Sequence, residues 1–319
     1  MIRVAALDLG TNTTRLLVAD VQDGRVEDIE RRVEITRMGE GVDARRRLLP
    51  LPIARVRNSL SEYRRALEQL GAQRALAVAT SAVRDADNGE AFLGEVEWSF
   101  GFTTRLLSGG DEAMLTFRGA TLGQSVEKPT LVVDLGGGST ELIVGDRDGV
   151  HFQVSVDAGA VRMTERYLHS DPPTSLYLEQ CARAVRALLA EHVPDHVRPR
   201  AAIGVAGTIT TLAALAQNLP EYDPERVHGY RLSAEDVDTQ LARLATLPLN
   251  YRQEVPALEP KRASVIVAGA VILREVLAHF ALGEIEASER DLLHGVALEA
   301  AQLSEPVEGD APPGAYTCC

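Results

Sequence analysis

The segments DLGTNTTRLLVAD (residues 8–20) and DLGGGSTELIVGD (residues 134–146) have the same pattern at two places in one chain. In each segment an apolar run ends at an aspartate, and a turn of glycine and small hydroxyl residues follows. A second apolar run then leads to an Asp-Gly pair, which is typical of a β-hairpin. Either segment alone would fit an ordinary hairpin of one large sheet. Together, at a spacing too long for a solenoid repeat, they favour two similar lobes made by duplication.

The two turns have the composition of anion-binding loops. Glycine and small side chains let backbone N–H groups approach an anion closely, and phosphate groups are common ligands of such turns. We therefore expect the two lobes to face each other across a cleft, with a chain of phosphate groups bound by both turns.

The rest of the chain alternates strand-like and helix-like segments, an order that is typical of α/β layers. The first part is predicted to form strands 3–9, 15–21 and 25–35, helix 51–70, strand 75–79, helix 88–98, strand 102–107 and helix 108–123. After strands 130–135, 141–144 and 150–156, the second part is predicted to form helices 160–168 and 176–191, strand 200–205, helices 209–216, 234–244 and 260–280, strand 284–287 and helix 292–303. These segments predict domains over 1–122 and 123–303, followed by a disordered tail over 304–319 that is rich in Pro, Gly and acids.

The composition is that of a globular protein, because 45% of the 319 residues are hydrophobic and 25% are charged. No apolar stretch approaches the ~18 residues of a membrane span, so we expect no membrane partner. The three cysteines, Cys181, Cys318 and Cys319, make no disulfide framework, which favours the reducing cytoplasm. The net charge of −13 lies mostly in the second half of the chain and argues against nucleic acid as a partner.

Arginines concentrate in the first half of the chain, above all in the run Arg45-Arg46-Arg47. Guanidinium groups suit phosphate oxygens, because their planar fork can donate two hydrogen bonds at once. Such a run is more often simply a solvated face, and the sequence leaves both interpretations open.

Three small-residue turns follow apolar strands, at residues 10–13, 136–139 and 207–208. In the first two, an aspartate ends the strand (Asp8 and Asp134). A carboxylate is poorly suited to touch phosphate, but it suits a hydrated Mg²⁺ that bridges to phosphate oxygens. The run Gly136-Gly137-Gly138 is the clearest of these signals, because three glycines weaken a fold unless the backbone needs the space. The alternative for this run is a flexible hairpin loop.

The segment SGGDEA (residues 108–113) places Asp111 and Glu112 at the start of a helix, where acids interact well with the helix dipole. Beside bound phosphates, a carboxylate there can also orient and deprotonate an attacking water. Arg84 follows a buried strand, at the end where α/β proteins bind ligands. The sequence contains no P-loop, zinc-protease or nucleophilic-serine motif, so attack by water on a phosphoanhydride is the reaction that fits.

These motifs resemble those of the exopolyphosphatase/guanosine-pentaphosphate phosphohydrolase (Ppx/GppA) family, within the actin-like ATPase superfamily. The similar segments run in the family's order from the first strand to the last helix: DLGTNTTRLLVADV (8–21), ATSAVRDADN (79–88), LLSGGDEAMLTFRGA (106–120), LVVDLGGGSTELIVG (131–145), AGAVRMTERYL (158–168) and GVAGTITTLAAL (204–215). The resemblance implies an α/β fold of two ribonuclease-H-like lobes, with the active site in the cleft between them.

The resemblance also implies roles for individual residues. Glu112 falls on the family's general base for water, and Asp134 and Glu141 fall on acidic positions associated with a divalent metal, for which we expect Mg²⁺. The positions implied to contact phosphate are Asp8, Thr11, Asn12, Arg84, Gly136, Gly137, Gly138, Ser139, Gly207 and Thr208.

The implied reaction releases terminal orthophosphate from inorganic polyphosphate, or the 5′ γ-phosphate from guanosine pentaphosphate. The resemblance further implies a homodimer. Family members often have two glutamates where this chain has Asp111 and Glu112, and many have Arg-Glu-Gly where this chain has Leu293-His294-Gly295. Longer members continue with a helical module after the matched region, so we expect short polyphosphate chains to be substrates here.

Two other functions would use the same fold. The first is an ATP-binding switch like the relatives of actin, in which nucleotide stabilises lobe closure and hydrolysis is incidental. The second is phosphotransfer to an acceptor such as a sugar, which needs an acid poised over the acceptor hydroxyl. Glu112 is the one candidate for that acid in the sequence.

Overall fold

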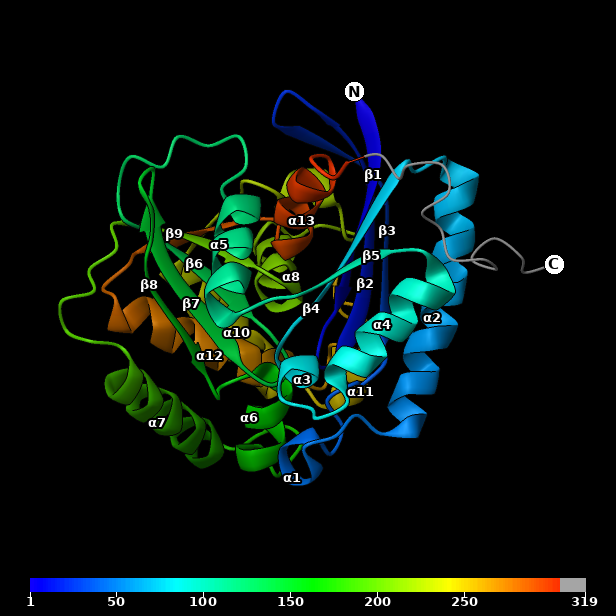
Figure 1. Ribbon diagram of the computed structural model, residues 1–319. Coiled ribbons are helices and arrows are strands. Elements are labelled where there is room, and N and C mark those ends of the chain that lie inside the picture. The colour runs from blue at the N-terminus through cyan, green and yellow to red at the C-terminus, as the bar shows by residue number, and fades with distance from the viewer. Residues whose placement is uncertain (305–319) are drawn as a thin grey trace. The chain divides into compact units, whose positions relative to one another are not determined.

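The computed structural model describes residues 1–304, which form two compact α/β units (Figure 1). Unit 1 comprises Met1–Gly123 and the chain from Leu292 onward, and unit 2 comprises Gln124–Asp291. The boundary after Gly123 is next to the predicted one, but the last helix belongs to unit 1 and not to a domain over 123–303. Most of the predicted disordered tail (304–319) lies outside the described residues, which end at residue 304.

Unit 1 contains a five-stranded mixed sheet with the order β3-β2-β1-β4-β5. Strands β1, β2 and β3 form an antiparallel meander, while β4 pairs parallel to β1 and β5 parallel to β4. The turn between β2 and β3 has positive φ at Asp23 and Gly24, as a tight hairpin requires. The strands are β1 (Ile2–Leu9), β2 (Thr13–Gln22), β3 (Arg25–Ile35), β4 (Arg74–Ala79) and β5 (Thr103–Leu106).

Helices cover both faces of this sheet, because alternate residues of its central strands are apolar and buried on each side. Leu7 of β1 packs in the cluster that includes α2 and α4, whereas Ala6 packs in the cluster that includes α5 and α13. The helices are α1 (Val42–Arg45), α2 (Pro50–Leu70), α3 (Ser81–Arg84), α4 (Gly89–Phe100), α5 (Gly109–Ala120) and α13 (Leu292–Ala300).

The last helix, α13, completes the core of unit 1. Leu293 and Val296 are buried in one cluster with Leu115 of α5. A Cβ atom on Gly295 would lie 2.2 Å from the carbonyl oxygen of Leu115, so only glycine allows the two helices to approach this closely. His294 is 1% exposed, and its Nε2 lies 3.0 Å from Oδ1 of Asp28 on β3. The departure from Arg-Glu-Gly at residues 293–295 therefore lies in a packed helix.

Unit 2 contains a six-stranded sheet with the order β10-β11-β9-β6-β7-β8. Its first three strands again form an antiparallel meander, and β9 again pairs parallel to the first of them. The predicted duplication is therefore visible in the strand order of both units. The strands are β6 (Thr130–Leu135), β7 (Thr140–Asp146), β8 (Gly149–Val156), β9 (Ala201–Val205), β10 (Arg231–Ser233) and β11 (Glu284–Ala287).

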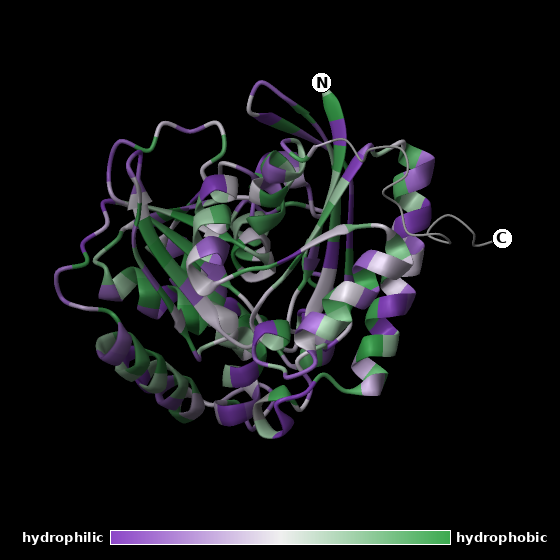
Figure 2. Cartoon of the chain, viewed as in Figure 1, coloured by the Kyte–Doolittle hydropathy of each residue, from purple (hydrophilic) through white to green (hydrophobic). Residues whose placement is uncertain are grey.

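The helices of unit 2 pack around one large apolar core. They are α6 (Ala160–Tyr167), α7 (Ser175–His192), α8 (Gly207–Ala216), α9 (Pro224–Val227), α10 (Ala234–Thr246), α11 (Leu249–Arg252) and α12 (Ile266–His279). Figure 2 shows β6 and β7 mostly in the hydrophobic colour, while α7 alternates between hydrophobic and hydrophilic along its length. Among residues 1–304, no helix has the length and apolar character needed to cross a bilayer.

The predicted helix over 260–280 is wrong at its start, because α12 begins at Ile266. The preceding residues are held in turns by bonds between residues three apart, such as Ala263 N–H to the Pro260 carbonyl. Apolar spacing does not distinguish such turns from the first part of a helix. The short elements α1, α3, α9, α11 and β10 were not predicted either.

Candidate active site

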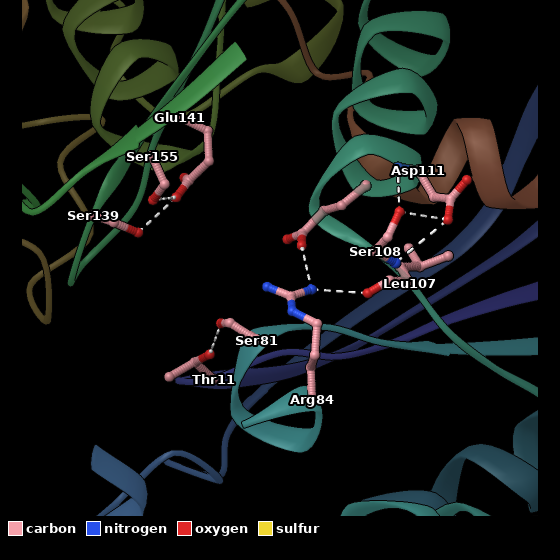
Figure 3. A network of polar contacts seen from close by, with 10 residues as sticks. Thr11, Ser81, Arg84, Leu107, Ser108, Asp111, Ser139, Glu141 and Ser155 are labelled. Carbon is pink, nitrogen blue, oxygen red and sulfur yellow. Dashed lines mark hydrogen bonds and ion pairs between the residues drawn. The ribbon is translucent and has the colours of Figure 1, made fainter. Parts of the chain in front are cut away.

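The turn between β1 and β2 is closed by one backbone hydrogen bond, from Gly10 N–H to the Thr13 carbonyl at 3.0 Å. Its other carbonyls accept hydrogen bonds from the segment after β3. Asn12 accepts from the N–H groups of Thr36 and Arg37, and Thr11 accepts from Gly39 at 2.8 Å. The Thr11 hydroxyl lies 2.9 Å from that of Ser81, as Figure 3 shows, so the turn is also tied to α3.

The turn between β6 and β7 is built in the same way in unit 2. Gly136 N–H donates to the Ser139 carbonyl, again at 3.0 Å. The carbonyls of Gly136 and Gly137 accept from the first N–H groups of α6, and Gly138 accepts from Arg162 Nε at 2.7 Å. A Cβ atom on Gly159 would lie 2.3 Å from the Gly137 carbonyl carbon, so the backbones touch directly.

Most carbonyl groups of both turns are therefore engaged, whereas several of their N–H groups are left as donors. Within residues 1–304, no hydrogen bond is donated by the backbone N–H groups of Thr11, Asn12, Gly137, Gly138 and Ser139. Unsatisfied N–H groups of adjacent residues in a turn make a concave anion-binding site. The predicted phosphate-binding residues of the two turns fit this arrangement through their backbones.

The third predicted turn opens α8 at Gly207 and Thr208. Ala206 precedes it with φ 69° and ψ 164°, a conformation that is costly for any residue with a Cβ atom. The Thr208 side chain is buried against Gly269 of α12, so Thr208 offers its backbone N–H at the helix start and not its hydroxyl. The first N–H groups of a helix have no acceptor inside the helix and favour anions.

Arg262 adds a positive charge at the start of α8. A Cβ atom on Gly207 would lie 1.2 Å from Nη1 of Arg262, so the guanidinium lies directly over this glycine. Arg262 Nε also donates to Glu259 at 2.9 Å. A cation beside a helix N-terminus is unfavourable by itself, because both carry positive charge, and a bound anion would relieve that repulsion.

Asp8 lies beneath the first turn and is 3% exposed. Its register partner on β2 is Arg15, whose Nε and Nη2 approach Asp8 Oδ2 at 2.8 and 2.7 Å. Asp8 is therefore a buried, ion-paired carboxylate that supports the turn. Its predicted role as a phosphate contact gains no support from this position.

Asp134 occupies the equivalent strand end in unit 2, and its register partner on β7 is Glu141. Directly opposite residues of an antiparallel pair project to the same face, where two carboxylates repel each other. Glu141 Oε1 accepts hydrogen bonds from Ser139 and Ser155 at 2.7 and 2.8 Å, which fixes its orientation (Figure 3).

This pair of acids fits the predicted divalent cation. Carboxylate oxygens are the ligands that Mg²⁺ prefers, and the ion usually keeps several waters and adds phosphate oxygens. Within the described part of the chain, no group of three or more metal-ligating side chains occurs. Asp134 and Glu141 would thus hold an ion whose remaining ligands come from water and substrate.

The two acids at the start of α5, Asp111 and Glu112, have different surroundings. Asp111 forms a capping box with Ser108, and the hydrogen bond from Ser108 holds the pKa of Asp111 below its usual value (Figure 3). Glu112 is 28% exposed, and its Oε2 lies 3.8 Å from Nη1 of Arg84. Arg84 also donates to the Leu107 carbonyl at 2.8 Å. Arg84 is thereby anchored with its charge next to Glu112.

Sequence reasoning missed two residues of these sites. Arg15 was passed over as a strand residue, although its position in the repeat matches that of Glu141. Arg262 was placed within a predicted helix, and only the turns before α12 bring it to Gly207. The signal available for Arg15 was the repeat itself, whereas no local pattern marked Arg262.

The two units define the class of the protein. Each has a meander that continues into parallel strands, with a small-residue turn whose N–H groups are free to bind anions, as in the actin-like ATPase fold. The chain belongs to the Ppx/GppA phosphatase family, whose model matches residues 17–303.

Relatives support this membership along most of the chain. Exopolyphosphatase 2 of Mycobacterium tuberculosis is 40% identical over 317 residues, which cover 94% of this chain and 98% of that protein. The crystal structure of the Aquifex aeolicus Ppx/GppA family member superimposes with a TM-score of 0.83 at 31% identity, covering 94% and 98% of the two chains. An exopolyphosphatase from Cytophaga hutchinsonii has a TM-score of 0.80 at 23% identity over 96% and 100%, which supports the fold alone.

Proposed function

We propose that this protein hydrolyses the terminal phosphoanhydride bond of inorganic polyphosphate and releases orthophosphate. The observation that carries the proposal is the set of backbone donors in the two repeat turns, whose carbonyls are occupied while their N–H groups are left to bind anions. Its relative in M. tuberculosis, named exopolyphosphatase 2, supports polyphosphate as the substrate.

Glu112 is proposed as the general base. Its carboxylate accepts a proton from a water molecule while the water oxygen bonds to the terminal phosphorus. The bond from that phosphorus to the bridging oxygen breaks, and the bridging oxygen becomes the new end of a shorter chain. Arg84, whose Nη1 lies 3.8 Å from Oε2 of Glu112, is proposed to orient the carboxylate. General-base assistance of this kind contributes about 10²–10⁴ in rate.

The turns are proposed to bind the substrate's phosphate groups through the N–H groups at residues 11–12 and 137–139, with the start of α8 as a further donor set. Hydrogen bonds to developing negative charge stabilise the transition state when they are already oriented. Asp134 and Glu141 are proposed to hold Mg²⁺, which when bound would neutralise charge on the phosphate oxygens.

A phosphate-release assay tests this function. It compares tripolyphosphate, longer polyphosphates, guanosine pentaphosphate and ATP, each with and without Mg²⁺. We expect Mg²⁺-dependent release from polyphosphate. Release only from guanosine pentaphosphate would move the activity to that substrate within the same site, and turnover confined to ATP would reject polyphosphate hydrolysis in favour of an ATP-binding switch.

We also propose that the protein is a homodimer. Strand β3 is an edge strand of its sheet, and it exposes Ile29, Val33 and Ile35 by 39%, 59% and 55%. Exposed apolar residues on an unpaired edge favour association with another chain. Sedimentation equilibrium measures the mass directly, and a monomer at all micromolar concentrations would reject the dimer.

We propose a cytoplasmic location, for which the cysteine content is the supporting feature. Cys181 is fully buried, and burial raises its thiol pKa to about 12, so it is an unreactive core residue. Cys318 and Cys319 lie outside the described residues. Fractionation of cells that express the protein, with a cytoplasmic marker as control, tests the location.

A further inference from the structure

The segment between β3 and α2 contains four arginines, Arg37, Arg45, Arg46 and Arg47, and we call residues 36–48 the arginine loop. All four side chains are exposed. Within residues 1–304, leaving the side chain of Asp43 aside, none of the four guanidinium groups forms an ion pair or a hydrogen bond with a carboxylate. The loop also contains two acids, Glu40 and Asp43, and Glu40 is paired with Arg55 of α2 at 2.7 Å. The loop therefore carries a net positive charge in a protein whose net charge is −13.

The arginine loop is fixed against the first phosphate-binding turn. Its N–H groups at Arg37 and Gly39 donate to the carbonyls of Asn12 and Thr11 at 2.9 and 2.8 Å. The two backbones approach so closely that a Cβ atom on Gly39 would lie 2.3 Å from the Thr11 methyl group. The same contacts that occupy the turn's carbonyls therefore place the start of the loop beside its free N–H groups.

The far end of the loop is fixed on the segment that follows α3. The Arg46 carbonyl accepts from Asp87 N–H at 2.8 Å, and the Asn88 side chain bonds both the N–H and the carbonyl of Leu48. Figure 1 shows α1 at the same end of unit 1 as α3, the helix that ends with Arg84. The three consecutive arginines thus have a defined place near α3, and they are not on a freely moving loop.

Two of the arginines have a backbone conformation that is uncommon for large side chains. Arg37 has φ 49° and Arg46 has φ 51°, in the left-handed region that usually selects glycine or asparagine. A merely solvated loop could use glycine at these positions with less strain. Strained residues that persist on a surface are a reason to look for a ligand.

We propose that the arginine loop binds the inner phosphates of a long polyphosphate chain, beyond the end group bound at the turn of Thr11 and Asn12. This inference rests on the proposed function and assigns it a preference for long chains, in contrast to the short chains expected from the sequence. A protein with a strongly negative net charge repels a long polyanion, so capture requires a local cluster of cations. Arginine suits this role, because its fork donates to phosphate oxygens in several orientations and is weakly hydrated. Tripolyphosphate is too short to use the whole loop.

The test compares two triple variants with equal loss of charge. The first combines Arg45→Ala, Arg46→Ala and Arg47→Ala. The control combines Arg25→Ala, Arg65→Ala and Arg118→Ala, three exposed arginines of unit 1 that have no carboxylate partner within residues 1–304. Arg25 begins β3 directly after the hairpin turn at Asp23 and Gly24, at the opposite end of β2 from the turn of Thr11 and Asn12. Arg65 lies five residues before the end of α2, and Arg118 lies in the last turn of α5.

The loop variant is expected to raise KM for long-chain polyphosphate by about 10-fold, the sum of three exposed charge contacts of moderate strength. Its KM for tripolyphosphate is expected to stay near that of the wild type, and the control to change neither value. The long-chain KM of the wild type should also rise more steeply with salt than that of the loop variant. Replacement of the same three arginines by lysine should restore most of the affinity, because lysine keeps the charge.

Equal effects of the loop variant on long and short chains would overturn the inference, and so would an equal effect of the control variant. Binding of long-chain polyphosphate, measured by isothermal titration calorimetry, separates this inference from the proposed hydrolysis. If no variant or wild type releases phosphate, weaker binding by the loop variant alone still supports the loop. Equal binding by all three proteins, or no binding by any, would reject it.

Discussion

The two repeat turns differ most at one pair of residues. In unit 1 the carboxylate at the strand end, Asp8, has the cation Arg15 as its register partner, whereas in unit 2 Asp134 has the anion Glu141. The backbone hydrogen bond that closes each turn is the same, at 3.0 Å. One copy of the duplicated motif therefore neutralises its own acid, and the other places two acids together.

This difference suggests that the two copies of the motif have different roles. Arg15 compensates the negative charge of Asp8 beneath the turn of unit 1. The pair Asp134 and Glu141 places two carboxylates opposite each other on neighbouring strands, where we propose that Mg²⁺ is held. The catalytic carboxylate we propose, Glu112, belongs to unit 1.

The largest expected effect concerns Glu112. Glu112→Gln removes the proposed base while it keeps the size of the side chain, so kcat should fall by about 10²–10⁴-fold with little change in substrate binding. Asp111→Asn is the matched control: Asp111 has no assigned chemical role, so this substitution should lower kcat only by the small amount that loss of the helix cap causes. Phosphate release at saturating polyphosphate measures both. Near-normal turnover by Glu112→Gln would show that Glu112 is not the general base.

The next prediction compares how the pairs Asp8–Arg15 and Asp134–Glu141 affect the stability of the folded protein. Arg15→Met leaves Asp8, which is 3% exposed, without its ion-pair partner, and should destabilise the fold by about 3 kcal/mol. Glu141→Gln removes repulsion from Asp134 and should leave metal-free stability unchanged or higher. Urea denaturation in the presence of a chelator measures both. Equal destabilisation by the two substitutions would contradict the comparison.

A smaller effect concerns the metal. Glu141→Gln should raise the Mg²⁺ concentration needed for half-maximal activity by at least about 10-fold, the lower range for the loss of a group that supports a metal site. Ser155→Ala removes one of two hydrogen bonds to Glu141, so it should also raise the Mg²⁺ concentration needed for half-maximal activity, but by less. Titration of activity with MgCl₂ gives the comparison. An unchanged Mg²⁺ requirement in Glu141→Gln would exclude this glutamate as a ligand.

The smallest effect compares two capping boxes. Ser108→Ala in α5 and Ser233→Ala in α10 each remove an N-cap, and each should cost about 1 kcal/mol. Ser108 lowers the pKa of Asp111 from its ordinary 3.8, so part of the stabilisation exists above that pH and is lost as pH falls through the folded-state value. The deficit of Ser108→Ala should therefore shrink in acid. Only Ser108→Ala should also lower kcat, because the cap positions the helix turn that carries Glu112. If the loss of stability in Ser108→Ala does not change with pH, the ionised carboxylate of Asp111 does not contribute to the stability of this cap.

Much of the fold follows from local patterns in the sequence. Short apolar runs in β1 and β2 and the glycine after α2 predicted these elements within a few residues, because backbone geometry and burial act over short distances. The repeat of Asp-Leu-Gly predicted that two sheets would share one strand order. The start of α12 was not predictable in this way, because turns and helix have the same apolar spacing over a few residues.

The candidate site was only partly predictable for the same reason. The glycines at 136–138 and the acids at 111 and 112 could be selected from sequence, since glycine and helix-start acids have local physical causes. Local sequence places Asp111 and Glu112 alike, and only the family resemblance selected Glu112; the structure adds that Asp111 is the acid that forms the capping box. That the Thr208 side chain packs against Gly269, and leaves the backbone N–H as the group available to a ligand, was visible only in the structure.

The sequence by itself determined the duplicated strand-turn-strand motif and its anion-binding composition, because both depend on neighbouring residues. Tertiary structure decided which partner each motif received. Arg15 and Glu141 become decisive only when strand pairing sets them opposite an aspartate, and Arg262 only when a turn brings it over Gly207. Helix α13 likewise belongs to unit 1, although all of unit 2 lies between it and the rest of unit 1 in the sequence. Its apolar face completes a core to which residues near the start of the chain contribute. Contacts between distant parts of a chain depend on the complete packing, which no short stretch of sequence encodes.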